Sequence, residues 1–132
     1  MDEIQAAVLR VKLPRLDGWN GRRREIATRY STEIENPRVR CPRDLGENYV
    51  AHLYVIRAAD RDRLREHLAV KGVPTDIHYP VPDHRQMAIA DVFAGIANPV
   101  AEAACNEVVT LPCFPEMTED EVSFVIAAVN SW

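Results

Sequence analysis

The sequence predicts an α+β fold, with a kinked helical arm over residues 1–34 and a small domain over residues 35–132. Apolar residues recur at helical spacing in the arm. Short runs rich in β-branched and aromatic residues follow, and signals for helix starts and ends separate them. The expected order after the arm is β-α-β-α-β-α, with a sheet of about three strands.

The arm is predicted to be one helix in two parts. In "MDEIQAAVLRVKL", the residues Ile4, Val8 and Val11 fall on one helical face. Pro14 has no backbone N–H to donate, so it must kink or end this first part. The second part should run to about residue 34, with an apolar stripe formed by Leu16, Trp19, Ile26 and Tyr30. A long amphipathic helix on a small domain usually packs against something larger.

The small domain is predicted to contain three strands and three helices. The strands are residues 49–58, 75–79 and 108–111. The helices run from Asp60 to a C-terminal Gly72, from Asn98 and Pro99 to Glu107, and from a capping box of Thr118 and Glu121 to Asn130. Residues 35–48 are polar and rich in proline, which predicts a surface connection.

Composition and charge limit the classes of function. The chain has 132 residues and a formal net charge of −4, which argues against nucleic acid as a partner because phosphate binding needs a concentrated positive surface. It shows no signal peptide and no apolar run long enough to cross a bilayer, so we expect no membrane partner and a cytoplasmic location. The three cysteines are far apart and form no CxxC pattern, which indicates free thiols; they are Cys41, Cys105 and Cys113.

One segment concentrates side chains that could carry chemistry. "DIHYPVPDHRQ", residues 76–86, places two histidines and a tyrosine around two prolines. His78 and His84 lack a nearby third ligand of fixed geometry, so we do not expect a metal site. The chain has no glycine-rich phosphate loop and no nucleophile motif. The residue pattern alone therefore indicates no catalytic residue and no self-contained active site.

Three stretches of the chain resemble, in order, the C-terminal part of one enzyme family. They are "MDEIQAAVLRVKLPRLDGWNGRRREIATRY", "HLYVIRAADRDRLREHLAVKGVPTDIHYPVPDHRQ" and "LPCFPEMTEDEVSFVIAAV". The chain is similar to the C-terminal region of the DegT/DnrJ/StrS nucleotide-sugar aminotransferases, which depend on pyridoxal phosphate. The resemblance implies the small C-terminal domain of the fold-type-I aminotransferases, without the large domain that binds the cofactor.

The resemblance also implies a function and a site. Members of the family work as dimers and transfer an amino group, commonly from glutamate, to a keto group on a nucleotide-linked sugar. Matching positions suggest that His78, Tyr79 and, more weakly, His84 bind the substrate. The only lysines are Lys12 and Lys71, and neither is placed as a Schiff-base lysine. We therefore expect no cofactor-binding residue here and no activity of the chain alone.

Two main hypotheses about function remain open. The chain is either the C-terminal domain of a sugar aminotransferase or a free-standing, non-catalytic interaction module derived from that family; a small independent binding protein or enzyme is a third. The first two predict an exposed apolar face on residues 4–30, which contacts the large domain or a second copy of the chain. The basic run Arg22–Arg24 is expected to lie on a solvated or interface-facing surface.

Overall fold

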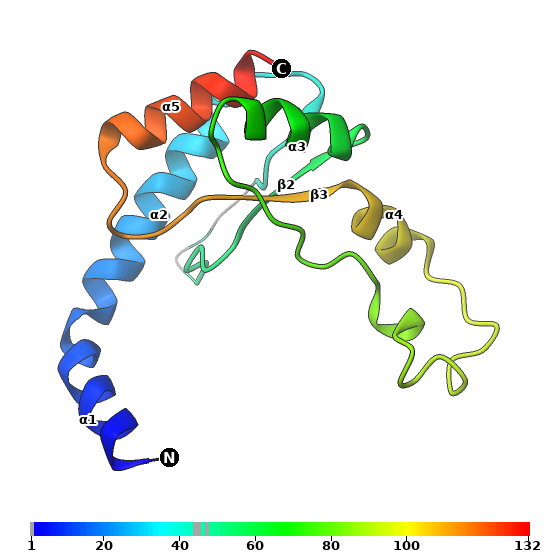
Figure 1. Ribbon diagram of the computed structural model, residues 1–132, viewed down its shortest axis with the longest axis horizontal. Coiled ribbons are helices and arrows are strands. Elements are labelled where there is room, and N and C mark those ends of the chain that lie inside the picture. The colour runs from blue at the N-terminus through cyan, green and yellow to red at the C-terminus, as the bar shows by residue number, and fades with distance from the viewer. Residues whose placement is uncertain (1, 44–45, 47) are drawn as a thin grey trace.

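The computed structural model describes residues 2–43, 46 and 48–132, so residues 44, 45 and 47 of the expected surface connection lie outside it. Its elements are α1 (Glu3–Lys12), the 3₁₀ turn η1 (Leu13–Arg15), α2 (Leu16–Glu33), β1 (Val39–Arg40), β2 (Tyr54–Ala58), α3 (Arg61–Val70), the 3₁₀ turn η2 (Asp83–Arg85), α4 (Pro99–Glu107), β3 (Val108–Leu111) and α5 (Glu119–Asn130). Figure 1 shows α2, α3 and α5 gathered with the sheet, while α1 and the segment between η2 and α4 extend away. The α+β class is confirmed.

The helical arm has the predicted kink. The α-helix α1 ends at Lys12, and Pro14 lies in the 3₁₀ turn that joins it to α2. At the start of α1, the backbone N–H of Asp2 donates to Oε1 of Gln5 at 3.3 Å. No residue of α1 is buried, whereas α2 buries Ile26 and Tyr30. Only the second half of the arm therefore joins the core.

The sheet has three antiparallel strands in the order β1-β2-β3. In its register, Val39 lies opposite Ala58, and Ile56 lies opposite Val109. The central strand β2 buries every second residue, as a half-buried strand should. Strand β3 is buried along its whole length. The sheet therefore has the expected size.

Two of the predicted strands are placed differently. Strand β2 starts only at Tyr54, because Ala51 has a φ of 50° and this left-handed conformation interrupts an extended chain. The predicted strand 75–79 is an isolated bridge between Asp76 and Thr110, since Pro74 and Pro80 cannot donate to a ladder. The third strand of the sheet is instead β1, which lies in the segment 35–48 predicted to be a surface connection. The order is therefore β-β-α-α-β-α, and the predicted alternation of strands and helices is wrong.

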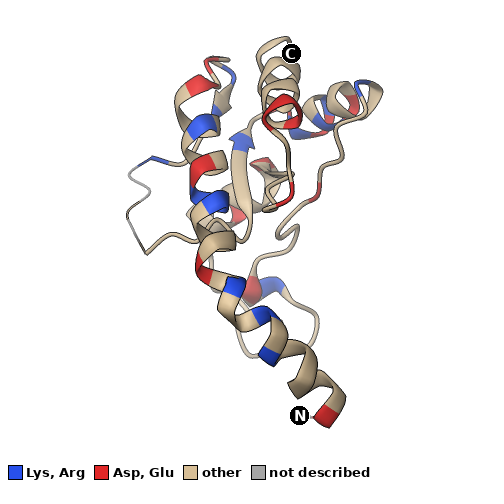
Figure 2. Cartoon of the chain, turned by 90° about the vertical axis from the view of Figure 1, so that its left-hand side faces the viewer, with Lys and Arg blue, Asp and Glu red and all other residues tan. Residues whose placement is uncertain are grey.

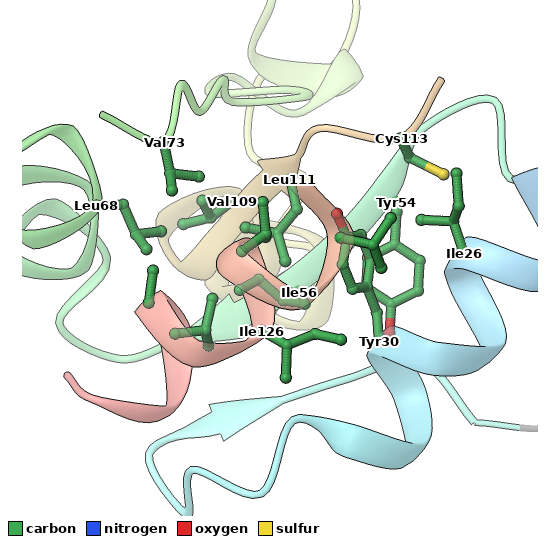
Figure 3. Close-up of a cluster of buried hydrophobic side chains, with 14 of the residues drawn as sticks. Ile26, Tyr30, Tyr54, Ile56, Leu68, Val73, Val109, Leu111, Cys113 and Ile126 are labelled. Carbon is green, nitrogen blue, oxygen red and sulfur yellow. The ribbon is translucent and has the colours of Figure 1, made fainter. Parts of the chain in front are cut away.

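The core lies between the sheet and helices α2, α3 and α5 (Figure 3). Side chains from the sheet meet side chains from α3 and α5; they include Ile56, Val109, Leu111, Leu68 and Ile126. On the α2 side, the rings of Tyr30 and Tyr54 lie 5.1 Å apart. The Tyr30 hydroxyl donates to the carbonyl of Pro112 at 2.8 Å, so this buried polar group is satisfied.

The helix ends in the small domain agree closely with the predictions. Gly72 follows α3 with a φ of 78°, and its N–H donates to the carbonyl of Ala69 at 2.9 Å. The N–H of Glu121 donates to the Thr118 hydroxyl at 3.2 Å, and the N–H of Thr118 donates to the Glu121 carboxylate at 2.8 Å. This reciprocal pair is the predicted capping box at the start of α5.

Charged side chains join α2 to α5. Guanidinium nitrogens of Arg22 and Arg29 lie 2.6 Å and 2.8 Å from carboxylate oxygens of Glu119. Arg22 also donates to the carbonyl of Met117 at 2.9 Å. Figure 2 shows the alternating basic and acidic residues along α2 to which these arginines belong. Arg22 of the predicted basic run is therefore partly covered by α5, and it pairs there with the exposed carboxylate of Glu119.

Candidate functional site

The segment 76–86 starts beside strand β3. The N–H of Asp76 donates to the carbonyl of Thr110 at 3.2 Å, and the N–H of Thr110 donates back at 2.8 Å. Nδ1 of His78 lies 2.9 Å from the hydroxyl of Thr110, a residue that is only 7% exposed. This hydrogen bond fixes the imidazole of His78 on the edge of the sheet.

Tyr79 points its ring away from the core. It is 65% exposed, and its ring stands edge-on to that of His78 with the centroids 5.2 Å apart. Within the described part of the chain, the Tyr79 hydroxyl forms no hydrogen bond. A phenol hydroxyl without a hydrogen-bond partner in the protein can donate a hydrogen bond to a bound molecule or accept one from it. His78 and Tyr79 therefore form a pair of neighbouring side chains that can contact a bound molecule.

His84 faces a different element. Its Nε2 lies 2.9 Å from Oε1 of Glu102 on α4, and its side chain is only 10% exposed. Arg85 donates to the same carboxylate oxygen from Nη2 at 3.0 Å. The hydrogen bond from His84, and then that from Arg85, holds the pKa of the Glu102 carboxyl below its usual value. The three candidate residues are thus held at two places, at β3 and at α4.

The partners of these histidines were not identified from the sequence. Thr110 offered a weak signal, because it is the one polar residue of an otherwise apolar strand. Glu102 offered none, because a glutamate in the first turn of a helix is common for reasons of the helix dipole alone. Only the fold brings these two residues to the segment 76–86.

An apolar cavity lies elsewhere. It has a volume of about 490 Å³ between α5 and the segments that follow α3 and β3, and its lining includes Val73, Pro74, Phe114, Met117 and Phe124. Among the residues described, His78, Tyr79 and His84 are not part of this lining. Its two carboxylates, Asp120 and Glu121, belong to the first turn of α5, where Glu121 takes part in the capping box, so they are explained by the helix start. The hydrogen-bonded histidines are therefore the better candidate site.

The described residues do not fit pyridoxal phosphate. The internal aldimine needs a lysine amine that is shielded from solvent. Lys12 is exposed at the end of α1, and Lys71 is exposed just after α3. No chemical step through this cofactor can therefore be assigned to residues of this chain.

The described ranges contain neither a candidate metal site nor a helix that could span a membrane. Residues 2–43, 46 and 48–132 contain no group of three or more His, Cys, Asp or Glu side chains that could hold a metal ion. Across the same ranges, the helices are too short or too polar for a membrane span.

The three cysteines are free thiols, as their spacing predicts. Burial raises the pKa of the Cys113 thiol to about 11, and burial also raises the pKa of the Cys41 thiol. Since the thiolate is the reactive form, a raised pKa makes these two groups poor nucleophiles. They act as small core residues.

The exposed apolar face of the arm is present on α1, η1 and the first residue of α2. Ile4 is 74% exposed and Val11 is 71% exposed, and Val8, Leu13 and Leu16 also face solvent. Farther along the arm, the predicted exposure gives way to burial in the core. The arm thus carries its uncovered apolar surface on residues 4–16.

The model of the DegT/DnrJ/EryC1/StrS aminotransferase family matches residues 1–130. The dTDP-3-amino-3,6-dideoxy-alpha-D-galactopyranose transaminase of Aneurinibacillus thermoaerophilus is 41% identical over 133 residues, which cover 100% of this chain and 36% of that protein. The erythromycin biosynthesis sensory transduction protein EryC1 of Saccharopolyspora erythraea is 42% identical, and the match covers 99% of this chain and 37% of that protein.

Solved structures agree with the sequence relatives. The crystal structure of S. venezuelae DesV, in complex with a ketimine intermediate, superposes with a TM-score of 0.93 at 38% identity and covers 100% of this chain and 36% of that one. A DegT DnrJ EryC1 StrS aminotransferase from Brucella abortus superposes with a TM-score of 0.90 at 30% identity, over 99% of this chain and 35% of that one. The chain thus spans 36% of the length of its relative from A. thermoaerophilus. By sequence and by fold, it belongs to the DegT/DnrJ/EryC1/StrS aminotransferase family.

Proposed function

We propose that this chain is the C-terminal region of an aminotransferase that transfers an amino group, from an amino acid such as glutamate, to the keto group of a nucleotide-linked sugar. One observation carries the proposal. The whole chain aligns with 36% of each of two relatives named as transaminases of dTDP-linked amino sugars.

In this proposal, His78, Tyr79 and His84 lie on the substrate side of the site. His78 is anchored by Thr110, and the exposed Tyr79 hydroxyl has no competing partner in the described chain. Pro80 and Pro82 limit the freedom of the backbone that follows. A stiff segment with a histidine and a tyrosine suits the recognition of sugar hydroxyls or phosphate oxygens, which accept and donate hydrogen bonds.

The chain by itself does not catalyse the reaction. Its two lysines, Lys12 and Lys71, are exposed to solvent, so neither can supply the shielded amine that pyridoxal phosphate needs. The cofactor is bound by the part of the longer enzyme that lies outside this region. This chain therefore contributes only the substrate-binding residues of the proposed active site.

The partner of the arm is that remaining part of the enzyme, or a second copy of the chain in a homo-oligomer. The apolar residues Ile4, Val8 and Val11 are exposed on α1, and such a surface is usually covered in a soluble protein. We propose no nucleic-acid partner and no membrane partner, and a cytoplasmic location.

Two measurements test the proposed function. The first is the size of the native protein, by immunoblot of a cell extract with an antibody against this domain. The second is turnover of a dTDP-linked keto sugar with glutamate and pyridoxal phosphate, by the native polypeptide and by the purified 132-residue chain. We expect a native polypeptide much larger than this chain, turnover by that polypeptide, and none by the chain. Turnover by the chain alone would contradict our proposal.

The alternative is a free-standing interaction module that has lost catalysis. The observation in its favour is the exposed apolar face of α1, which could bind a second copy of the chain or a full-length aminotransferase. A native band at the 14.9 kDa of this chain, together with a stable oligomer, would support this alternative over the first proposal.

A further inference from the structure

The 80–98 loop, which joins Tyr79 to α4, does not pack into the hydrophobic core. None of its residues is buried, and Met87 in its middle is 96% exposed. The backbone hydrogen bonds of residues 85–96 stay within the loop; for example, the N–H of Gln86 donates to Asp83 at 3.0 Å. A segment with so little burial needs other contacts to keep one orientation.

Those contacts converge on one carboxylate. Among the described residues, the hydrogen bonds that join residues 80–97 to the rest of the domain all end on Oε1 of Glu102. His84 approaches it at 2.9 Å, and Arg85 approaches it at 3.2 Å from Nε and at 3.0 Å from Nη2. Hydrogen bonds to an ionised group are about twice as strong as neutral ones.

The helix that carries Glu102 is itself tied to the sheet. At its C-terminal end, Glu107 accepts from Nε of Arg57 on β2 at 3.0 Å. Arg61 of α3 donates to the carbonyl of Cys105 at 2.5 Å. The route from the sheet to the loop therefore runs through α4 and ends at Glu102.

We propose that Glu102 is a positioning residue, which acts through His84 and Arg85 to fix the 80–98 loop and with it the direction of the chain that leaves Tyr79. The contact between His78 and Thr110 holds the chain just before the loop, and Glu102 holds the first third of the loop. The consequence for substrate binding rests on the function proposed above. The clamp itself is a property of this chain and can be tested without activity.

The first experiment compares Glu102→Gln with Glu66→Gln in the 132-residue chain. Glu66 is exposed on α3 and forms no ion pair in the described structure, so it controls for the loss of one carboxylate. We expect the Gln86 and Ile89 amides to exchange with deuterium about tenfold faster in Glu102→Gln, because charged hydrogen bonds are lost. We also expect a change in the ring ¹⁵N shifts of His84, while those of His67 stay unchanged.

A second variant separates the clamp from the stability of α4. Glu102 lies in the first turn of α4, so Glu102→Gln could loosen that helix directly. The double variant His84→Ala, Arg85→Ala removes the same three hydrogen bonds from the loop side and changes no residue of α4. Faster loop exchange in both variants, with α4 protected in the second, supports the proposal. Loop exchange equal to that of Glu66→Gln in both variants would overturn it.

The native polypeptide then shows whether the clamp serves the substrate. Glu102→Gln should raise KM for the nucleotide sugar about tenfold and leave kcat within about twofold, because only the orientation of the binding segment changes. Equal KM values in Glu102→Gln and Glu66→Gln would overturn the link to substrate binding. Absence of turnover in the unmodified polypeptide would instead overturn the proposed function, and the exchange result would still decide the role of Glu102.

Discussion

The imidazole of His78 and the hydroxyl of Thr110 are joined by a hydrogen bond of 2.9 Å between the candidate site and strand β3. Both side chains are largely shielded from solvent, since the side chain of His78 is 23% exposed and Thr110 is 7% exposed. Each group satisfies the other, so loss of one leaves its partner without a hydrogen bond in a poorly solvated place. Nε2 of His78 remains 3.6 Å from a carboxylate oxygen of Asp76.

Replacement of this hydroxyl should release the ring. In Thr110→Val, we expect the free energy of unfolding to fall by about 1 kcal/mol, because one hydrogen bond to a shielded group is lost. Urea titration followed by tryptophan fluorescence measures this loss. The ¹⁵N shifts of the His78 ring should also change in the folded variant.

Thr110→Ser serves as the matched control, because it keeps the hydroxyl. Its His78 ring shifts should stay close to those of the unmodified chain, even if the lost methyl group lowers stability. Identical His78 shifts in Thr110→Val and in the unmodified chain would show that the hydrogen bond does not orient the ring.

The apolar face of α1 makes a prediction about association. Val8→Asp places a charge in the middle of the exposed face formed with Ile4 and Val11. If this face covers a partner, the association constant should fall at least about tenfold, which corresponds to 1.4 kcal/mol. Sedimentation equilibrium measures this change directly.

Val70→Asp is a suitable control for that experiment. Val70 is 90% exposed on α3, so this substitution adds the same charge to the surface of a different helix. It should leave association unchanged. Equal oligomeric state and solubility for Val8→Asp, Val70→Asp and the unmodified chain would exclude α1 as an interface.

The helices could be predicted from the sequence because their signals are local. Gly72 ends α3, Pro99 starts α4, and Thr118 with Glu121 starts α5, at the predicted places. Each signal depends on hydrogen bonds within one turn of the chain. The kink at Pro14 follows in the same way from one missing N–H.

The strands and the site could be predicted only in part, because they depend on distant residues. A two-residue strand such as β1 has no periodicity, and it exists because β2 offers it a partner at Ala58. The segment 75–79 has the composition of a strand but pairs only at Asp76. Likewise, the histidines are visible in the sequence, whereas Thr110 and Glu102 become their partners only in the folded chain.

The link between α2 and α5 predicts a pH dependence of stability. The hydrogen bond from Arg22 is the main cause that holds the pKa of the Glu119 carboxyl below its ordinary value of 4.5, and Arg29 adds to it. Because the folded pKa is depressed, the stabilising contribution of Glu119 is complete above the unfolded pKa and is lost as the pH falls through the folded pKa. Glu119→Gln should therefore lower stability at neutral pH and reduce the loss between about pH 6 and about pH 3.

Asp120→Asn tests whether that effect belongs to the ion pairs. Asp120 is the next residue in the first turn of α5 and shares the helix dipole, but it forms no ion pair within the described residues. Its variant should keep the pH dependence of the unmodified chain in urea titrations. The same pH dependence in Glu119→Gln and in the unmodified chain would show that Arg22 and Arg29 add no stability through Glu119.

Tyr79 provides the most direct test of the substrate side of the proposed enzyme. In the native polypeptide, Tyr79→Phe should lower kcat/KM for the nucleotide sugar about tenfold, as expected for the loss of one hydrogen bond to the substrate. Since the Tyr79 hydroxyl has no hydrogen-bond partner in the described chain, the same change should leave the free energy of unfolding nearly constant.

Tyr49→Phe is its control, with the opposite pattern. The Tyr49 hydroxyl donates to the carbonyl of Leu53 at 3.0 Å, so its loss should lower stability and leave kcat/KM unchanged. Steady-state kinetics and urea titration on both variants separate the two roles. If Tyr79→Phe keeps the full kcat/KM, then Tyr79 does not bind the substrate, and His78 alone would remain as the candidate at the start of the loop.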